Sequence, residues 1–279
     1  MINKILVFNF YLTENWGELI TNKIHLECLK KYSNCFDRAL FFVVVDDINN
    51  NKLITNFKKY IINSISIVNI SFVNKENNIL REARNFYDEI ALKLGSIEGL
   101  LFFGHNKGIT NYDSPKYDND CVEKWITSMY YGCLSNNDEL VDCLYNKRKL
   151  TYGTLLNKME DDIFSTDEYR EKINFWMGKR KYHYMGTFFW MNCQSINSFL
   201  LNNNKAIPPL TDRWYAENFF SNLFDIEHCA SFNNSGLLNY FGQGCWDMDE
   251  VLDICLDDKL KEYYIFHNSI MNLVYENRN

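Results

Sequence analysis

The chain has 279 residues, of which 47% are hydrophobic and 23% charged, and its 29 Lys and Arg against 36 Asp and Glu give a formal net charge of −7. A chain of this length can form a substantial core without disulfides or structural metals. The acidic balance and the lack of a basic run argue against a nucleic-acid partner, because phosphate backbones are bound by clustered cations.

The nine cysteines are odd in number and include no Cys-x-x-Cys pair. We therefore expect buried thiols in a reducing compartment, namely the cytoplasm, or the host cytoplasm if the protein is viral. The apolar stretch at residues 5–12 is interrupted by Asn9, and no small-residue cleavage site follows it. No segment approaches the roughly 20 apolar residues that cross a bilayer, so we expect a soluble protein without a transmembrane segment.

The first part of the chain alternates β-rich apolar runs with segments of helical periodicity. The expected strands are residues 4–10, 39–45, 65–73 and 100–103, and the expected helices are residues 16–28 and 79–94. The first helix follows Asn15-x-x-Glu18, which has the pattern of a capping box. The order strand, helix, strand, strand, helix, strand predicts an open, mostly parallel α/β sheet flanked by helices.

Beyond residue 108 the pattern is less regular. We expect helices at residues 122–133, 165–176 and 214–224, and strands at residues 149–155, 183–193 and 262–266. There is no internal repeat and no long linker. We therefore predict a single domain over residues 1–279, with a nucleotide-binding half at 1–110 and a more irregular half at 111–279.

Polar residues follow several predicted strands, at the edge where open α/β sheets bind ligands. They are Thr13-Glu14-Asn15, Asp46-Asp47, Gly104-His105-Asn106-Lys107-Gly108 and His267-Asn268. Carboxylates, a basic loop and an imidazole suit a nucleotide diphosphate. In the basic loop, glycines allow close backbone approach and Lys107 offers an ammonium to a phosphate, although an ordinary turn with an exposed lysine explains the pattern equally well. The Walker A and Gly-x-Gly-x-x-Gly spacings are absent, which argues against an NTPase or a nicotinamide dehydrogenase.

Four segments carry a family resemblance. They are Leu100–Gly108 (LLFFGHNKG), Trp125 with Met129, Gly186–Trp190 (GTFFW), and Arg213 with Ala216-Glu217. In this order they resemble a set of bacterial, phage and large-virus glycosyltransferases with a GT-A-like fold. In that set a strand runs into aromatic-x-His-x-Lys-Gly, a W-x-x-x-M helix and a G-N-F-W-W-like strand follow, and R-x-x-A-E comes last. The similarity spans about residues 1–225, and it departs from the pattern at Asn106 and Thr187.

The resemblance implies a GT-A-like (Rossmann-type) open mixed sheet and transfer of a sugar from a nucleotide-sugar donor, with a UDP-sugar expected, to a hydroxyl of a glycan or other glycoconjugate acceptor. Residues 111–279 would then form the acceptor-side half. The roles implied are Asp46 near base or ribose, His105, Lys107, Gly108 and His267 near the diphosphate, Gly186, Phe188, Trp190 and Arg213 at sugar or acceptor, and Glu217 as catalytic base. A solvent-facing Glu217, or one paired with Arg213, and a structural His267 are the competing interpretations.

A metal cofactor is not certain. Most GT-A enzymes hold Mn²⁺ or Mg²⁺ with Asp-x-Asp after the fourth strand, where this chain has Gly104-His105-Asn106. Asp118-x-Asp120 and Asp247-x-Asp249 have the spacing, but a hard cation needs several converging oxygens, which spacing alone does not supply. We therefore expect Lys107 and His105 to supply most of the positive charge, with Mn²⁺ or Mg²⁺ left open as a cofactor.

Two other functional classes remain at this stage. A non-catalytic nucleotide- or carbohydrate-binding module on the same fold would keep Asp46 and Lys107 but would not need Glu217. A metal-dependent phosphoesterase or nuclease would require acids from separate loops to converge, chiefly Asp46 and Asp118 with their neighbours Asp47 and Asp120.

Overall fold

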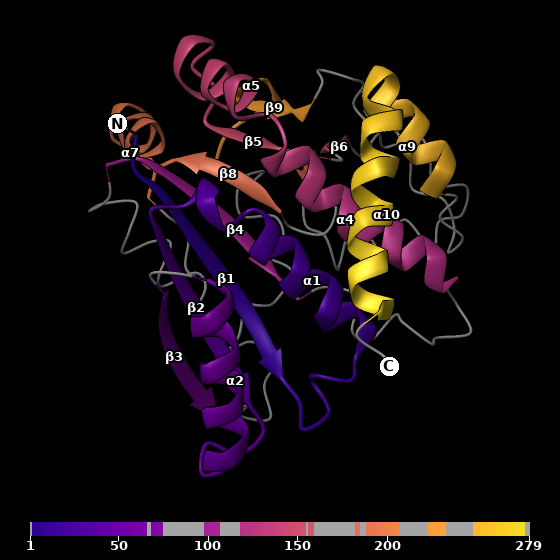
Figure 1. The fold of residues 1–279 in the computed structure, drawn as a ribbon. Helices are drawn as coiled ribbons and strands as arrows, with labels where there is room; N and C mark the ends of the chain where they lie inside the picture. Colours follow the sequence, from indigo (N-terminus) through magenta and orange to yellow (C-terminus); the bar gives the residue numbers. More distant parts are fainter. Residues whose placement is uncertain are drawn as a thin grey trace, which may run out of the picture.

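The structure, a computed structural model, describes residues 2–65, 68–74, 98–106, 118–154, 156–158, 182–184, 188–206, 223–232 and 248–276. Within these residues the chain forms a sheet of seven strands, a separate pair of short strands, and helices on both faces of the large sheet (Figure 1).

The large sheet contains β1 (Lys4–Leu12), β2 (Arg38–Val45), β3 (Val68–Asn74), β4 (Leu100–His105), β5 (Thr151–Gly153), β8 (Phe189–Asn192) and β9 (Cys229–Ser231). The short pair is β6 (Leu156–Lys158) and β7 (Tyr182–Tyr184). The described α-helices are α1 (Ile20–Lys31), α2 (Asn51–Ser64), α4 (Asn119–Leu134), α5 (Asn137–Val141), α7 (Cys193–Asn202), α9 (Met248–Leu256) and α10 (Leu260–Glu276), with a π-helical turn at Asp142–Asn146.

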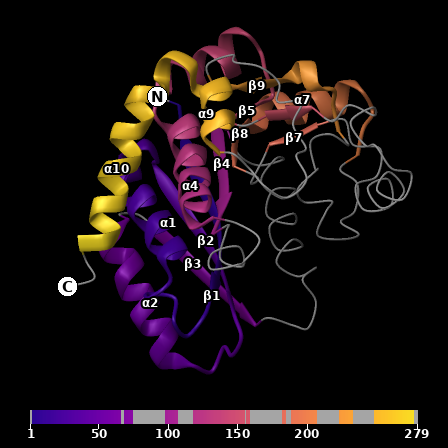
Figure 2. The ribbon, with the colours of Figure 1, turned by 90° about the vertical axis from the view of Figure 1, so that its right-hand side faces the viewer.

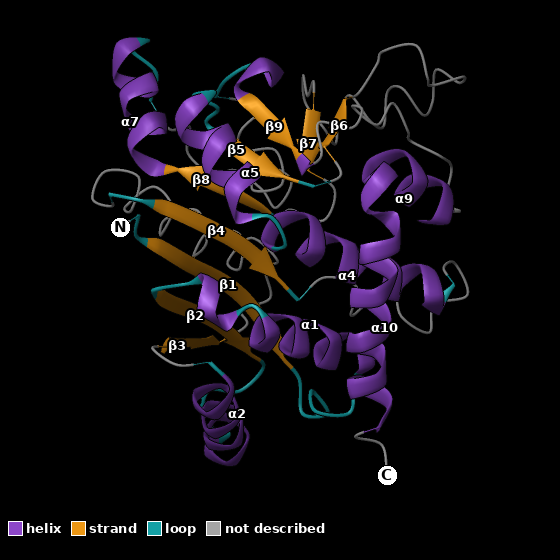
Figure 3. Ribbon diagram, turned by 45° about the horizontal axis from the view of Figure 1, so that its top comes forward, coloured by secondary structure: helices purple, strands orange, loops and turns teal. Residues whose placement is uncertain are grey.

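The strands of the large sheet lie in the order β3-β2-β1-β4-β8-β5-β9. Strands β1 to β4 are parallel to one another, β8 is antiparallel to both β4 and β5, and β9 is parallel to β5. Every strand of this sheet except β8 therefore runs in one direction, and Figure 3 shows the strands as one layer. The expected open, mixed, mostly parallel α/β sheet with flanking helices is confirmed, while the division into two halves at residue 110 stays a prediction.

Both faces of the sheet are covered, as the mainly apolar sequences of β1, β2 and β4 predict. On one face Phe8, Phe41 and Phe102 form a core with residues of α1, α2, α4 and α10. On the other face Leu101 and Met191 belong to a second core that includes residues of α7. Figure 2 shows α1, α2, α4 and α10 on one side of the sheet and α7 on the other. Because both faces are packed, we look for a ligand site beyond the carboxyl ends of the parallel strands.

The thiols of the described part are consistent with the expected reduced state. Five cysteines are buried and two are half-buried, and none of these seven forms a disulfide. The buried ones are Cys28, Cys133, Cys143, Cys193 and Cys229. The compartment itself stays a prediction.

Two expectations for the first half were wrong. The capping box at Asn15-x-x-Glu18 is a turn, in which the Glu18 N–H donates to the Asn15 carbonyl over 2.8 Å, and α1 begins at Ile20 without a side-chain cap. Helix α2 was not expected; it is capped by Asn50, whose side chain accepts from the Leu53 N–H over 3.2 Å. A helix is needed there because β2 and β3 are parallel, and parallel strands require a crossover.

Two strands expected in the second half also differ. Residues 183–193 do not form one strand, since β7 pairs with β6 and β8 belongs to the large sheet. Residues 262–266 lie inside α10, because Tyr263, Phe266, Ile270 and Val274 recur at helical spacing and are buried against the neighbouring helices. The predicted helices at 79–94 and 165–176, and most of that at 214–224, lie outside the described residues.

Candidate functional site

Strands β1, β2 and β4 end at the same edge of the sheet because they are parallel. Leu12 pairs with Val45, and Asn9 pairs with His105. The residues that follow these strands therefore lie next to one another at this edge. This strand-end edge, defined by Tyr11, Thr13, Asp46, His105 and Asn106, is the candidate site.

Asp46 is held by Tyr11. The Tyr11 hydroxyl donates to the two carboxylate oxygens of Asp46 over 2.8 and 3.0 Å. The neighbouring Asp47 has a different task, since its Oδ1 accepts from the Asn49 N–H over 2.8 Å in the turn before α2. Of the two acids expected after β2, Asp46 is therefore the one that the structure connects to the end of β1. It is exposed and can meet a ligand.

Asn106 connects the end of β4 to β1 and α1. Its Oδ1 accepts from the Tyr11 N–H over 2.9 Å, and its Nδ2 donates to the Tyr11 carbonyl over 3.0 Å. The same Nδ2 donates to Oδ1 of Asn22 over 3.1 Å. Nearly all of the Asn106 side chain is buried by these contacts. Sequence analysis placed this residue in the polar loop after a strand and noted it as a departure from a family pattern, but its hydrogen bonds to Tyr11 and Asn22 became apparent only from the structure.

His105 is half-buried at the end of β4, and its imidazole contacts two aromatic rings. Its ring stacks on Phe103, with centroids 6.2 Å apart and planes 20° apart, and lies 6.0 Å from the ring of Phe188. These contacts fix the ring beside the strand-end edge. The structure thus brings His105, Asp46 and the missed residue Tyr11 to one edge.

Thr13 is a second residue of this edge that sequence analysis did not single out for a role. Its hydroxyl is buried and has no hydrogen-bond partner among the described residues. A buried polar group without a partner costs about 1–3 kcal/mol, so such a group at the strand-end edge is unusual in a purely structural position. The sequence signal that could have identified Thr13 as a site residue was its position directly after β1.

Phe188 and Trp190 do not lie where their rings could contact a sugar or acceptor, contrary to what the resemblance implied. Both side chains are fully buried, with exposed fractions of 0% and 1%. Trp190 stacks on Phe36 and its Nε1 donates to the Cys133 carbonyl over 2.7 Å, while Phe188 lies against Tyr130. The correction has a simple cause: this face of β8 packs under α4, and a sugar does not reach it. We assign both rings to the core.

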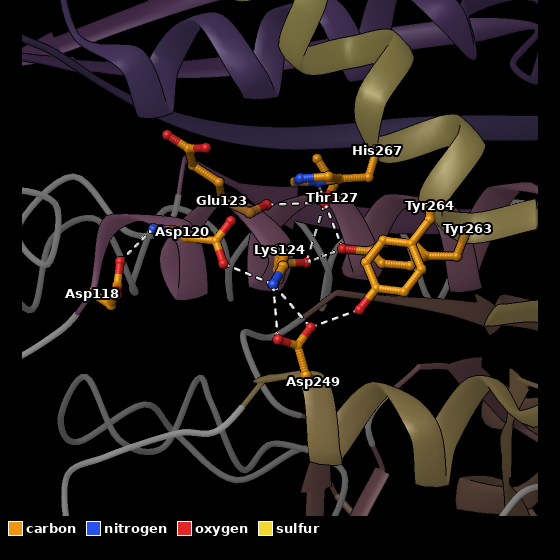
Figure 4. Close-up of polar contacts among 9 residues, drawn as sticks. All are labelled: Asp118, Asp120, Glu123, Lys124, Thr127, Asp249, Tyr263, Tyr264 and His267. Carbon is orange, nitrogen blue, oxygen red and sulfur yellow. Dashed lines mark hydrogen bonds and ion pairs between the residues drawn. The ribbon is translucent and has the colours of Figure 1, made fainter. Parts of the chain in front are cut away.

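His267 also lies elsewhere than expected, because it belongs to α10 and not to a strand end. It is almost fully buried, and its Nδ1 lies 2.9 Å from Oγ1 of Thr127 in α4 (Figure 4). Burial lowers the pKa of His267 below its usual value, and Asp120 and Asp249 only partly offset this. The side chain therefore serves the packing of α10 on α4, and we no longer place it near a diphosphate.

Acids from both Asp-x-Asp sequences meet at one lysine. The Nζ of Lys124 lies 2.7 Å from Asp120 and 2.8 Å from Asp249, and the Tyr264 hydroxyl donates to Asp249 over 2.6 Å (Figure 4). Although burial lowers the pKa of Lys124, its hydrogen bonds to Asp120 and Asp249 and their negative charges outweigh burial and raise the pKa overall. The other acid of the first sequence, Asp118, caps α4 by accepting from the Asp120 N–H over 2.9 Å.

This arrangement bears on metal binding. In the part of the chain that the structure describes, no three His, Cys, Asp or Glu side chains gather as metal ligands. Asp120 and Asp249 already have an ammonium between them, and the Asn106 amide is occupied by Tyr11 and Asn22. The described residues therefore do not fit a divalent cation at the strand-end edge. The convergent acids that a phosphoesterase or nuclease needs are also not found among them.

Five of the expected site residues lie outside the described residues: Lys107, Gly108, Gly186, Arg213 and Glu217. Asp247 does as well. Their roles stay predictions. None of the described helices has both the length and the apolar character needed to span a bilayer.

No family model matches the chain, and no curated protein does so either. Among solved structures it is similar to the mannosyltransferase Ktr4p from S. cerevisiae, at 11% identity over 83% of this chain and 69% of that chain, with a TM-score of 0.38. It is also similar to core-mannan synthase A (CmsA/Ktr4) from Aspergillus fumigatus in its Mn/GDP form, at 12% identity over 84% and 73% of the two chains, with a TM-score of 0.35. For S. aureus TarS 1–349 the identity is 9%, the coverage 80% of this chain and 55% of that chain, and the TM-score 0.34. These are likenesses of overall fold, and no residue role is transferred from them.

Proposed function

We propose that this chain is a glycosyltransferase that moves a sugar from a nucleotide-sugar donor to a hydroxyl of a glycan or other glycoconjugate. In the reaction the acceptor oxygen forms a bond to the anomeric carbon, and the bond from that carbon to the diphosphate oxygen breaks. The acceptor proton passes to a protein base, and the nucleoside diphosphate leaves with the bonding electrons.

The observation that carries the proposal is the meeting of three strand ends at one edge. Asp46 after β2, the end of β1 at Tyr11, and His105-Asn106 at the end of β4 are joined by side-chain hydrogen bonds or strand pairing. Ligands of open α/β sheets bind at this edge. The order of the sequence segments that resemble glycosyltransferases supports the same site, because the first of them ends in His105-Asn106-Lys107-Gly108.

Each residue then has a chemical task. Asp46, with a carboxylate already oriented by Tyr11, accepts hydrogen bonds from the base or ribose of the donor. His105 and Lys107 place positive charge beside the diphosphate, and Gly108 leaves room for its oxygens. Glu217 takes the proton of the acceptor hydroxyl, while Gly186 and Arg213 contact the sugar or acceptor.

The charge of the departing diphosphate must be neutralised in any such reaction. A bound Mn²⁺ or Mg²⁺ would supply this as a Lewis acid. At the described ends of these strands Asp46 is held by Tyr11, Asp47 accepts from the Asn49 N–H, and the amide of Asn106 is occupied, which is a poor ligand set for a hard cation. We therefore propose that side-chain cations, chiefly that of Lys107, carry this part of the reaction.

The proposal is tested by measuring binding of UDP, GDP, CMP, dTDP and their common sugar conjugates by calorimetry and thermal shift, each with Mn²⁺ and with EDTA. We expect one nucleotide, UDP, to bind selectively, and we expect this binding to persist in EDTA. At a ligand concentration of 100 times Kd the gain in stability is about 2.7 kcal/mol, which raises Tm by several degrees.

Turnover separates the enzyme from a binding module. Release of nucleoside diphosphate that depends on an added glycan acceptor supports transfer. Selective nucleotide binding without any turnover across acceptor classes would favour the non-catalytic module. If no nucleotide in the panel binds, the strand-end edge is not a nucleotide site and the proposed function is wrong.

A further inference from the structure

We propose that Asn106 is a positioning residue of the nucleotide site, acting through Tyr11 on the carboxylate of Asp46. The inference rests on the proposed function, because it concerns the placement of the group that would contact the base or ribose. Asn106 itself need not touch the ligand.

The side chain of Asn106 continues the β-ladder where β4 stops. The last pair between β1 and β4 is Asn9 with His105, and β1 runs on to Leu12. The Asn106 N–H still donates to the Asn9 carbonyl over 3.1 Å. Further along β1, the Asn106 side-chain amide bonds both the N–H and the carbonyl of Tyr11. A side-chain amide offers the donor and acceptor of a peptide group, so it replaces the strand residue that would otherwise pair there.

The orientation of this amide is determined by its surroundings. Its Nδ2 faces two acceptors, the Tyr11 carbonyl and Oδ1 of Asn22. Asn22 is fully buried, and its own Nδ2 donates to the Trp16 carbonyl over 3.1 Å. One continuous set of hydrogen bonds therefore links α1, the turn after β1 and the end of β4. An aspartate at position 106 would place a second oxygen against two acceptors, and the set would be broken.

The consequence reaches Asp46 through Tyr11. A fixed backbone at Tyr11 limits where its phenol can lie, and the phenol hydroxyl holds both oxygens of Asp46. A carboxylate that is already oriented loses less conformational freedom when a ligand binds. The ligand therefore binds more tightly than it would to a carboxylate that rotates freely. Removing the Asn106 amide should therefore weaken nucleotide binding at a distance.

The test compares Asn106→Ala with Asn192→Ala. Asn192 is a suitable control because it is also buried, its amide also bonds two backbone groups, and it pairs with Leu100 at the opposite end of β4. Both variants should lower Tm. Asn106→Ala should raise the Kd of the nucleotide that the wild type binds about tenfold, equivalent to 1.4 kcal/mol, whereas Asn192→Ala should change it less than about twofold. Asn106→Asp should not restore the wild-type Kd.

A double-mutant cycle tests the route. Tyr11→Phe removes the hydroxyl from Asp46 and keeps the backbone pairing with Asn106. If Asn106 acts through Tyr11, the double variant binds no more weakly than the weaker-binding single variant, whereas fully additive losses would overturn the route.

Hydrogen exchange gives a second test. The Tyr11 backbone amide should exchange with solvent faster in Asn106→Ala, and an unchanged rate would also overturn the route. Asn22→Ala, which removes the acceptor that orients the amide, serves in place of Asn106→Ala if that variant does not fold.

The outcomes separate this inference from the function on which it rests. A wild type that binds nucleotide together with an Asn106→Ala variant of equal affinity overturns the positioning role alone. A wild type that binds no nucleotide overturns the proposed function and this inference with it.

Discussion

Lys124 in α4 contacts the start of α9 through Asp249, whose carboxylate oxygen lies 2.8 Å from the lysine Nζ. The lysine side chain is largely buried, and its second acid, Asp120, is one turn earlier on the same helix. Because Tyr264 of α10 donates to the same Asp249 carboxylate, three helices meet at one ion pair. Acids with the spacing of a metal motif are thus used here to hold helices together.

Replacing this ammonium should weaken the attachment of α9. Lys124→Met keeps the length of the side chain and leaves Asp120 and Asp249 repelling each other, so we expect a loss of about 1 kcal/mol, because both acids are more than half exposed and screened. For a chain of this size that lowers Tm by about 2–4 °C. Lys147→Met is the control, since Lys147 pairs only locally with Asp142 over 3.0 Å and both are exposed. Equal Tm values for the two variants would show that the bridge between helices adds nothing.

The catalytic role of Glu217 is open to a direct test. Glu217→Gln keeps the size and hydrogen-bonding capacity of the side chain but cannot accept the acceptor proton, so transfer should fall by at least about 100-fold. Nucleotide Kd should stay within a few-fold of the wild type. Glu276→Gln, at the exposed end of α10, is the matched control and should behave like the wild type. Turnover retained in Glu217→Gln would remove this residue from the role of base.

Lys107 should show the opposite pattern. If its ammonium faces the diphosphate, Lys107→Ala loses a charge-assisted hydrogen bond worth about 1.5–3 kcal/mol, and the nucleotide Kd should rise at least tenfold. The salt dependence of binding should weaken at the same time. Lys59→Ala removes an exposed lysine from α2 and controls for net charge. The same Kd in both variants would contradict the diphosphate assignment.

The strands of the first half could be predicted because their signal is local. Residues 39–45 and 100–103 are unbroken apolar runs, and the corresponding strands β2 and β4 are buried on both faces. The prediction of a strand at residues 262–266 was wrong because it used the same local signal. Four apolar and aromatic residues in succession resemble a strand, although they belong to α10. The helical spacing appears only when the whole of α10, through Val274, is considered.

The structural role of Asn106 could not be predicted from sequence. Its two bonds to Tyr11 span 95 positions of the chain, and its bond to Asn22 spans 84. No local pattern distinguishes an asparagine that completes a β-ladder from one in an exposed loop. Asp46 was easier, because its place directly after a buried strand is itself a signal in an open α/β sheet.

The buried His267 makes the free energy of unfolding depend on pH, and the sign of this dependence follows from the direction of its pKa shift. Burial lowers the pKa of the folded imidazole below that of the unfolded chain. Above both values the residue is neutral in either state and contributes no dependence. As the pH falls below about 6.5, the unfolded chain binds the proton first, so stability decreases until the folded pKa is reached. Asp249 acts in a more acidic window, since hydrogen bonds from Lys124 and Tyr264 lower its pKa.

We therefore expect the free energy of unfolding of the wild type to fall between pH 7 and pH 5, with His267 contributing a slope of up to about 1.4 kcal/mol per pH unit. His267→Gln should remove this contribution and leave a flatter profile, measured by urea unfolding at each pH. Asp249→Asn should keep the wild-type slope of the free energy of unfolding above pH 5. Its profile should become flatter than that of the wild type only below about pH 4, where the carboxylate of Asp249 titrates in the unfolded wild-type chain. Parallel profiles for His267→Gln and the wild type would mean that protonation of another group controls this range.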